Sequence, residues 1–211
     1  MKQYLQEAIF VSIICILFVS SGPAQASLVI NEIMFNPAAV SDTNGEWMEI
    51  YNPGAALDLL NYALADGGGS YTIPSSLVIP AGGYLVFGRN ADTAVNGGVP
   101  VDMAYGTSLY FGNTGEPLSI LAPDGSLQDR VDYGAAGFPT AVGASICFTG
   151  SGDNADGANW FAASDLGIAY GAGDFGTPGA ANLTTSAVPE PGSLLLIGSG
   201  LLGLLRLNRR S

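Results

Sequence analysis

The 211-residue chain contains no histidine, two cysteines and only six lysine and arginine residues. Without histidine, neither a Ser-His-Asp triad nor a Cys-His catalytic pair can form. Zinc sites built on histidine or on sets of paired cysteines are excluded for the same reason. The glycine-rich signatures of phosphate-binding and dinucleotide-binding loops are also missing. These absences exclude the commonest kinds of enzyme site, and we predict no catalytic residue.

The scarcity of cysteine excludes a structural disulfide. Cys15 lies in the N-terminal segment discussed below, which leaves Cys147 alone in the rest of the chain. A single cysteine cannot form an intramolecular disulfide. Cys147 stands in the apolar run 145–148, so we expect it to be a small residue of the core.

Positive charge is scarce as well. Between residues 27 and 188 the sequence holds 16 carboxylates and two arginines, Arg89 and Arg130, which gives this part a net charge of −14. Proteins that bind nucleic acid rely on clustered lysine and arginine to displace counterions from phosphates. The composition therefore argues against a nucleic-acid partner and suits solubility or cation binding.

Apolar residues, 48% of the chain, come in short runs between glycine, proline, asparagine and aspartate. No 3.6-residue periodicity is present between the two ends of the chain. The runs predict strands at 28–35, 46–52, 57–65 (one strand or two), 70–73, 76–79, 84–87, 109–111, 117–122, 126–133 and 145–149. Eight or more short strands separated by turn residues are typical of an all-β antiparallel β-sandwich.

The first 26 residues have the parts of a secretory signal peptide. Lys2 precedes an uncharged apolar run from Ala8 to Val19, which is too short for a spanning helix of about 20 residues. Ala24 and Ala26 form a small-x-small cleavage site, so we expect cleavage before Ser27. The mature protein is predicted to be exported.

The other end of the chain predicts a membrane anchor. Residues 183–187 form a polar linker, and an uncharged run rich in leucine and glycine follows at about 191–205. As a helix this run spans roughly 22 Å, somewhat short of a hydrocarbon core of about 30 Å. Arg206, Arg209 and Arg210 follow it and should stay on the cytoplasmic side. The domain would then lie outside the inner membrane.

The order of these C-terminal parts resembles the PEP-CTERM sorting signal. Val188, Pro189, Glu190 and Pro191 precede the short apolar helix, and the arginines close the chain. The resemblance covers residues 188–211. It implies recognition by an exosortase, cleavage near Pro-Glu-Pro, and transfer from the inner membrane to the cell surface or the medium. Such proteins tend to come from organisms that make exopolysaccharide. An ordinary single-pass anchor is the alternative.

A second resemblance concerns the strands themselves. The chain is similar to the lamin tail domain over about residues 28–182, in segments of matching order and spacing. These segments are 30–37, 45–52, 79–86, 125–133, Trp160 and 177–182. The resemblance implies an immunoglobulin-like β-sandwich at 27–182. Bacterial domains of this kind occur on exported proteins, often attached to hydrolases or nucleases, and those of nuclear lamins bind proteins and chromatin.

Calcium is the cofactor that the carboxylates allow. If strands 28–35 and 46–52 are neighbours, Glu32 and Glu49 can face each other among apolar residues, where an unpaired carboxylate is costly. A calcium ion, a shared proton, backbone N–H groups or an exposed edge would each resolve that cost. The run 153–157 is a fragment of a calcium loop, and a solvated turn is its simpler interpretation.

The remaining features concern partners. Trp47, Trp160 and the tyrosines could form a carbohydrate platform, although their alternation along strands favours the core. We therefore predict an exported, non-enzymatic protein of the cell surface or extracellular matrix, with an adhesive or structural role. Its partners would be an exosortase, exopolysaccharide or surface proteins, and the inner membrane before processing. The alternative is a secreted hydrolase of glycans or phosphodiesters that uses only carboxylates.

Overall fold

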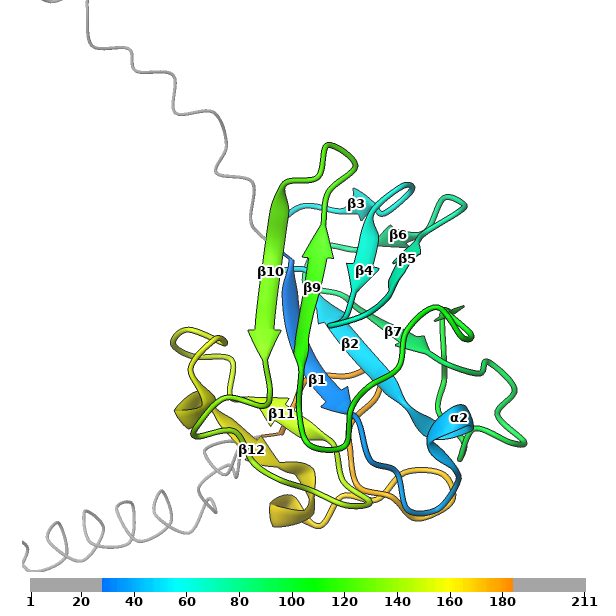
Figure 1. The fold of residues 1–211 in the computed structure, drawn as a ribbon, viewed down its shortest axis with the longest axis vertical. Helices are drawn as coiled ribbons and strands as arrows, with labels where there is room; N and C mark the ends of the chain where they lie inside the picture. Colours follow the sequence, from blue (N-terminus) through cyan, green and yellow to red (C-terminus); the bar gives the residue numbers. More distant parts are fainter. Residues whose placement is uncertain (1–27, 184–211) are drawn as a thin grey trace, which may run out of the picture.

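The computed structural model describes residues 28–183, which form two packed β-sheets (Figure 1). The strands are β1 (Val29–Met34), β2 (Trp47–Tyr51), β3 (Leu57–Asp58), β4 (Ala63–Ala65), β5 (Ser70–Thr72), β6 (Val78–Ile79), β7 (Tyr84–Gly88), β8 (Met103–Ala104), β9 (Pro117–Leu121), β10 (Leu127–Asp132), β11 (Ile146–Phe148) and β12 (Trp160–Ala162). One sheet has the order β12-β11-β1-β2-β7-β8 and the other β10-β9-β4-β5, while β3 and β6 form a separate pair. The predicted all-β sandwich is confirmed.

Helix is confined to short turns between these strands. The described residues contain α2 (Asp42–Gly45) and two 3₁₀ turns, η1 (Gly157–Asn159) and η2 (Ala163–Leu166). Within residues 28–183 no helix has the length and apolar character needed to cross a membrane. The predicted signal peptide, the linker beyond Leu183, the sorting motif, the 191–205 helix and the terminal arginines lie outside the described residues.

Most predicted strands are present. The run 57–65, expected as one strand or two, forms two, β3 and β4, because Asn61 turns the chain with a positive φ of 64°. The short strands β8 and β12 were not predicted, and β8 pairs parallel to β7. The predicted strand at 109–111 is wrong. Its backbone N–H groups bond to carboxylates instead of a strand: Tyr110 N to Asp66 Oδ2 and Phe111 N to Glu46 Oε2.

The main core lies between the two sheets. Ile33, Ile50 and Phe87 of the six-stranded sheet meet Leu64 and Ile120 of the four-stranded sheet in one buried cluster. Figure 1 shows β9, β10 and β4 lying in front of β1 and β2. Because side chains alternate along a strand, every second residue of β2 points into this core.

The outer face of the six-stranded sheet is also covered. Residues 170–182, which we call the C-terminal strap, run across it (Figure 1, orange). Trp47 belongs to a second small core on this face, and its Nε1 donates to the Tyr170 hydroxyl at 3.1 Å. Since both faces of β2 are covered, its alternating carboxylate, Glu49, is buried too.

The carboxylate of Asp129 joins the two sheets. The pairing of β1 with β2 is interrupted by a bulge between Ile30 and Glu32. Asp129 of β10 fills this break, because its Oδ2 accepts hydrogen bonds from Ile30 N at 2.6 Å and Asn154 Nδ2 at 2.7 Å. The bulge therefore keeps its backbone N–H satisfied although the ladder is locally lost.

Candidate functional site

Glu32 and Glu49 lie directly opposite each other on neighbouring strands. The β1–β2 register pairs them, as the sequence predicted for adjacent strands. Both residues have 0% of their surface exposed. Opposite residues of an antiparallel pair point to the same face of a sheet. The two carboxyl groups therefore share one buried environment on the outer face, beneath the C-terminal strap.

The strap and β11 supply the hydrogen-bond donors for Glu32. Thr177 donates its backbone N–H to Oε1 and its hydroxyl group contacts Oε2, each at 2.8 Å. Ser145, just before β11, donates its hydroxyl to Oε1 at 2.5 Å. Glu32 thus connects its own strand to two other segments that are more than 100 residues away in the sequence.

Glu49 is bound in the same way by a different part of the strap. Gly179 N donates to its Oε2 at 2.6 Å, and Asn31 Nδ2 donates to its Oε1 at 2.7 Å. Asn182 completes the attachment, because its Nδ2 donates to Asn31 O at 2.8 Å and to Phe148 O at 2.9 Å. The last residues of the domain are therefore fastened to the sheet through buried polar side chains.

The hydrogen bonds around Thr177 indicate where a proton lies. Its hydroxyl oxygen is 2.8 Å from Glu32 Oε2 and 3.1 Å from Asn182 Oδ1, yet a hydroxyl has only one proton to donate. Asn182 uses its Nδ2 for two carbonyls, so its Oδ1 can only accept. A proton on Glu32 Oε2, donated to Thr177, satisfies all three groups.

The acidity of the two glutamates agrees with this arrangement. Burial raises the pKa of Glu32 above its ordinary value of 4.5, although hydrogen bonds from Ser145 and Thr177 oppose the shift. Burial raises the pKa of Glu49 to about 8, against the hydrogen bond from Asn31. Backbone N–H groups, one of the resolutions that the sequence offered, are present in the structure, whereas the proton on Glu32 faces Thr177 and is not shared with Glu49.

Calcium at Glu32 and Glu49 stays a prediction. Among residues 28–183 no three or more histidine, cysteine, aspartate or glutamate side chains gather as a metal site. The two carboxyl groups face N–H and O–H donors from Asn31, Ser145, Thr177 and Gly179. A calcium ion requires lone pairs directed at it, and these donors compete for the same lone pairs.

The close fit of the strap depends on glycine at position 176. A Cβ atom built there would lie 2.9 Å from both Glu32 Oε1 and Ser145 Oγ. Such contacts are shorter than a carbon atom tolerates, so a larger residue would push the strap away from the carboxylate. Gly176 therefore allows the backbone to approach the buried glutamate.

Another buried carboxylate lies outside the glutamate pair. Glu46, just before β2, forms an ion pair with Arg89 at 3.1 Å, with both side chains largely buried. Burial raises the pKa of Glu46 to about 7 despite hydrogen bonding from Phe111 N and the charge of Arg89. Its Oε1 has no hydrogen-bond partner among the described residues. The Arg89 guanidinium in turn lies 5.3 Å from the centre of the Tyr110 ring.

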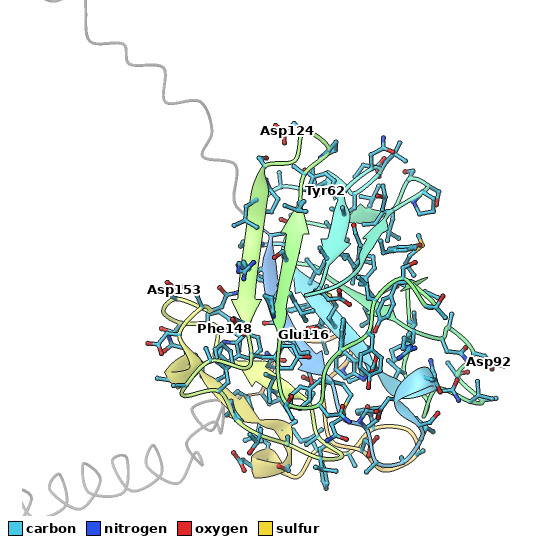
Figure 2. The ribbon with its side chains drawn as sticks, viewed as in Figure 1. Tyr62, Asp92, Glu116, Asp124, Phe148 and Asp153 are labelled. Atoms are coloured by element: carbon cyan, nitrogen blue, oxygen red, sulfur yellow. The ribbon has the colours of Figure 1, made fainter. Side chains whose placement is uncertain are left out.

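A hollow of about 300 Å³ opens next to Tyr110. Asp66 and Glu116 line it, the first from the loop after β4 and the second from just before β9. In Figure 2 Glu116 lies near the start of β9, well away from the hairpin turn at Asp124. This hollow brings together acidic side chains, hydroxyl groups and an exposed aromatic ring.

The other residues singled out by sequence serve packing or turns. Trp47 and Trp160 are 0% and 6% exposed, so they belong to the core and form no carbohydrate platform. Cys147 is buried as predicted, and burial raises the pKa of its thiol. Asp153 caps its own turn by accepting from Ala155 N at 2.9 Å, and it lies in a loop far from Asp92 (Figure 2).

Sequence reasoning identified the glutamate pair but not its partners. Asn31, Ser145 and Thr177 are common residue types, and the last two are distant from Glu32 in the chain. The segment 177–182 was the one available clue to these partners. It matches the family pattern, but the sequence alone assigned it no role. Tyr110 was missed because residues 109–111 were predicted as a strand, and Asp66 because nothing in its local sequence points to a role.

The comparisons with known proteins agree with the geometry. The family model for the Lamin Tail Domain matches residues 21–135, more than half of the chain. The model for the PEP-CTERM protein-sorting motif matches residues 187–210, which marks an exported protein that an exosortase sorts at the membrane. The search among curated proteins finds no match. The sandwich described above extends past the matched region, since β11 pairs with β1. The chain belongs to the lamin tail domain family.

Proposed function

We propose that this protein is a non-enzymatic component of the cell surface or extracellular matrix, in which one β-sandwich makes adhesive or structural contacts. The observation that carries the proposal is the attachment of Asn182 to the sheet, close before Val188, where the Val-Pro-Glu-Pro run of the sorting motif begins. Five residues, 183–187, separate the two, and at full extension they span at most about 18 Å. The folded sandwich thus lies directly before the sorting motif, and its surface is what it offers to partners.

Binding to extracellular polymer tests this role. The full chain, purified in a mild detergent, should be retained by polymer isolated from the surface of the producing cells. Binding should persist in high salt if it depends on neutral groups, because screening weakens only charge contacts. Absence of binding to every polymer and surface-protein fraction would count against an adhesive role.

The sorting step can be tested separately. Replacing Pro189, Glu190 and Pro191 with alanine should leave the protein in the inner-membrane fraction. The matched control replaces Thr184, Thr185 and Ser186 of the linker with alanine, and this variant should still reach the surface. If the Pro-Glu-Pro variant reaches the surface in equal amounts, the motif is not the sorting determinant.

The runner-up is a hydrolase that uses carboxylates alone. Glu32 and Glu49 are the pair that the sequence singled out for it, and their complete burial leaves no room for a polymeric substrate to touch them. Hydrolysis of glycans or phosphodiesters that is lost in Glu32→Gln or Glu49→Gln would nevertheless favour the hydrolase. A calcium role makes its own prediction, a higher melting temperature in calcium than in chelator, and equal temperatures would remove it.

A further inference from the structure

The hollow beside Tyr110 has the size and shape of a small-ligand site. It lies between the loop that follows β4 and the loop that follows β8, and Glu116 closes one side. Its volume of about 300 Å³ is at the lower end of the range of roughly 300–1,000 Å³ for such sites. The loop after β4 contains three consecutive glycines, 67–69, so few side-chain atoms obstruct this wall. One or two sugar units would fit such a space.

Tyr110 presents an aromatic surface that is held in place before any ligand binds. It is 53% exposed, whereas the two tryptophans are buried in the core. Arg89 lies against its ring and is itself fixed by the buried Glu46. The backbone N–H of Tyr110 donates to Asp66 Oδ2 at 2.7 Å. A side chain fixed in this way loses little conformational entropy when it contacts a ligand.

The polar atoms around the ring favour a ligand that donates hydrogen bonds. Asp66 accepts from Gly68 N at 2.7 Å, and Glu116 accepts from Gly112 N at 2.9 Å, so both carboxylates are oriented by the backbone. Each carboxylate oxygen has two lone pairs, which leaves Asp66 Oδ2 able to accept from a hydroxyl as well. The exposed side chains of Thr107 and Ser108 add groups that donate or accept.

The negative charge of the hollow narrows the class of ligand further. Two carboxylates in one small hollow repel uronate, sulfate and phosphate groups, and the domain around them carries a net charge of −14. A flat aromatic ring matches the apolar C–H face of a sugar, while carboxylates form strong hydrogen bonds with its hydroxyl groups. The combination suits a sugar without acidic groups.

We propose that this hollow binds a neutral sugar unit of an extracellular polysaccharide, with Tyr110 stacking on the sugar ring and Asp66 and Glu116 accepting from its hydroxyls. The proposal rests on the matrix role proposed above and names the site that would serve it. Thr107 and Ser108 also line the hollow and add hydroxyl groups that can bond to the sugar.

The test uses the full chain in detergent and isothermal titration with defined probes. These are oligomers of β-1,4-glucose, β-1,3-glucose, α-mannose and N-acetylglucosamine, with oligogalacturonate as the acidic probe and oligolysine as the cationic one. At least one neutral oligomer should bind, and oligogalacturonate should bind at least tenfold more weakly. Tyr110→Ala should weaken the neutral oligomer at least tenfold, whereas Tyr110→Phe should retain most of the affinity.

A second variant blocks the site without removing a contact. Gly68 lines the hollow and has open space around its Cβ position, so Gly68→Leu should fill the hollow and abolish binding without a clash. The matched control is Leu127→Ala, which removes an apolar side chain of similar exposure, 56%, on β10. Melting temperatures of all variants should stay close to that of the wild type.

Three outcomes would overturn the proposal. The first is that no neutral oligomer of the panel binds the wild type. The second is that Tyr110→Ala and Gly68→Leu bind the sugar as well as the wild type does. The third is that oligolysine binds in the hollow in preference to sugars, which would assign the hollow to a cationic partner.

Failure of the site can be distinguished from failure of the matrix role. If the variants still bind extracellular polymer as the wild type does, this site is wrong and the matrix role stands. If the wild type does not bind polymer at all, the matrix role itself fails.

Discussion

The two pairs of carboxylates in this molecule show how similar groups take on different tasks. Glu32 and Glu49 lie in the middle of two strands and are completely buried under the C-terminal strap. Asp66 and Glu116 lie in loops and line an open hollow. In each pair the carboxylates accept from backbone N–H groups. The difference is the covering segment, because water and ligands reach only the second pair.

The first pair therefore holds the C-terminal strap on the sheet, and the second pair faces an open hollow where a ligand can bind. A buried carboxyl group whose two oxygens are both hydrogen-bonded has little left to offer a ligand, but it strongly stabilises the segments that bond to it. A half-exposed carboxylate contributes less to stability and keeps lone pairs for a partner. Substitutions at the two pairs should therefore have effects of very different size.

The largest loss of stability is expected for Glu32→Ala. This change leaves the part-buried Thr177 N–H without its acceptor and leaves the Ser145 hydroxyl only the longer contact to Phe175 O at 3.3 Å, and an unsatisfied buried group costs about 1–3 kcal/mol. We expect the free energy of unfolding to fall by about 3 kcal/mol in urea denaturation. Glu32→Gln should lose far less, because a glutamine can donate to Thr177 as the protonated acid does. An equal loss for glutamine would contradict a proton on Glu32.

Gly176→Ala should have the second largest effect on stability. The added methyl group would lie 2.9 Å from Glu32 Oε1, so the strap must move outward, at a cost of about 1–3 kcal/mol. For a domain of this size, each kcal/mol lowers the melting temperature by roughly 2–4 °C. The control is Gly68→Ala, which meets no atom within 4 Å and should melt like the wild type. Equal melting of the two variants would show that the strap is not closely packed.

The pH dependence of stability should be opposite to that of a protein stabilised by salt bridges. The pKa of Glu49 is about 8 in the folded chain against an ordinary value of 4.5. The folded state therefore binds more protons in this range, and stability falls as pH rises from about 4.5 to 8. Melting temperatures measured from pH 5 to 8.5 should decrease. Glu49→Gln should flatten the curve in part, since Glu46, with a pKa of about 7, acts in the same direction. A melting temperature that rises with pH over this range would contradict the account.

The smallest effect on stability is expected at the hollow. Glu116→Gln keeps an oxygen that accepts from Gly112 N, and the side chain is partly exposed. The free energy of unfolding should stay within about 0.5 kcal/mol of the wild type. A loss as large as that of Glu32→Ala would mean that both pairs are structural, and the contrast between them would disappear.

The sequence predicted the features that depend on local pattern. The alternation of residues 46–52 predicted β2, and the hypothesis that this strand neighbours residues 28–35 placed Glu32 opposite Glu49. The strap could not be predicted in this way. Residues 170–182 have no strand or helix periodicity, and their place on the sheet depends on single hydrogen bonds to residues over 100 positions away. The same holds for Tyr110, whose backbone is held by carboxylates that local pattern does not reveal.

The most direct test of the account is amide hydrogen exchange at Thr177 and Gly179. These two N–H groups donate to Glu32 and Glu49, so they report whether the strap is closed on the carboxylate pair. The account predicts protection that approaches that of the core strands β1 and β2, and its loss in Glu32→Ala. Exchange as fast as that of the exposed turn at Asp124, in the wild type, would contradict it.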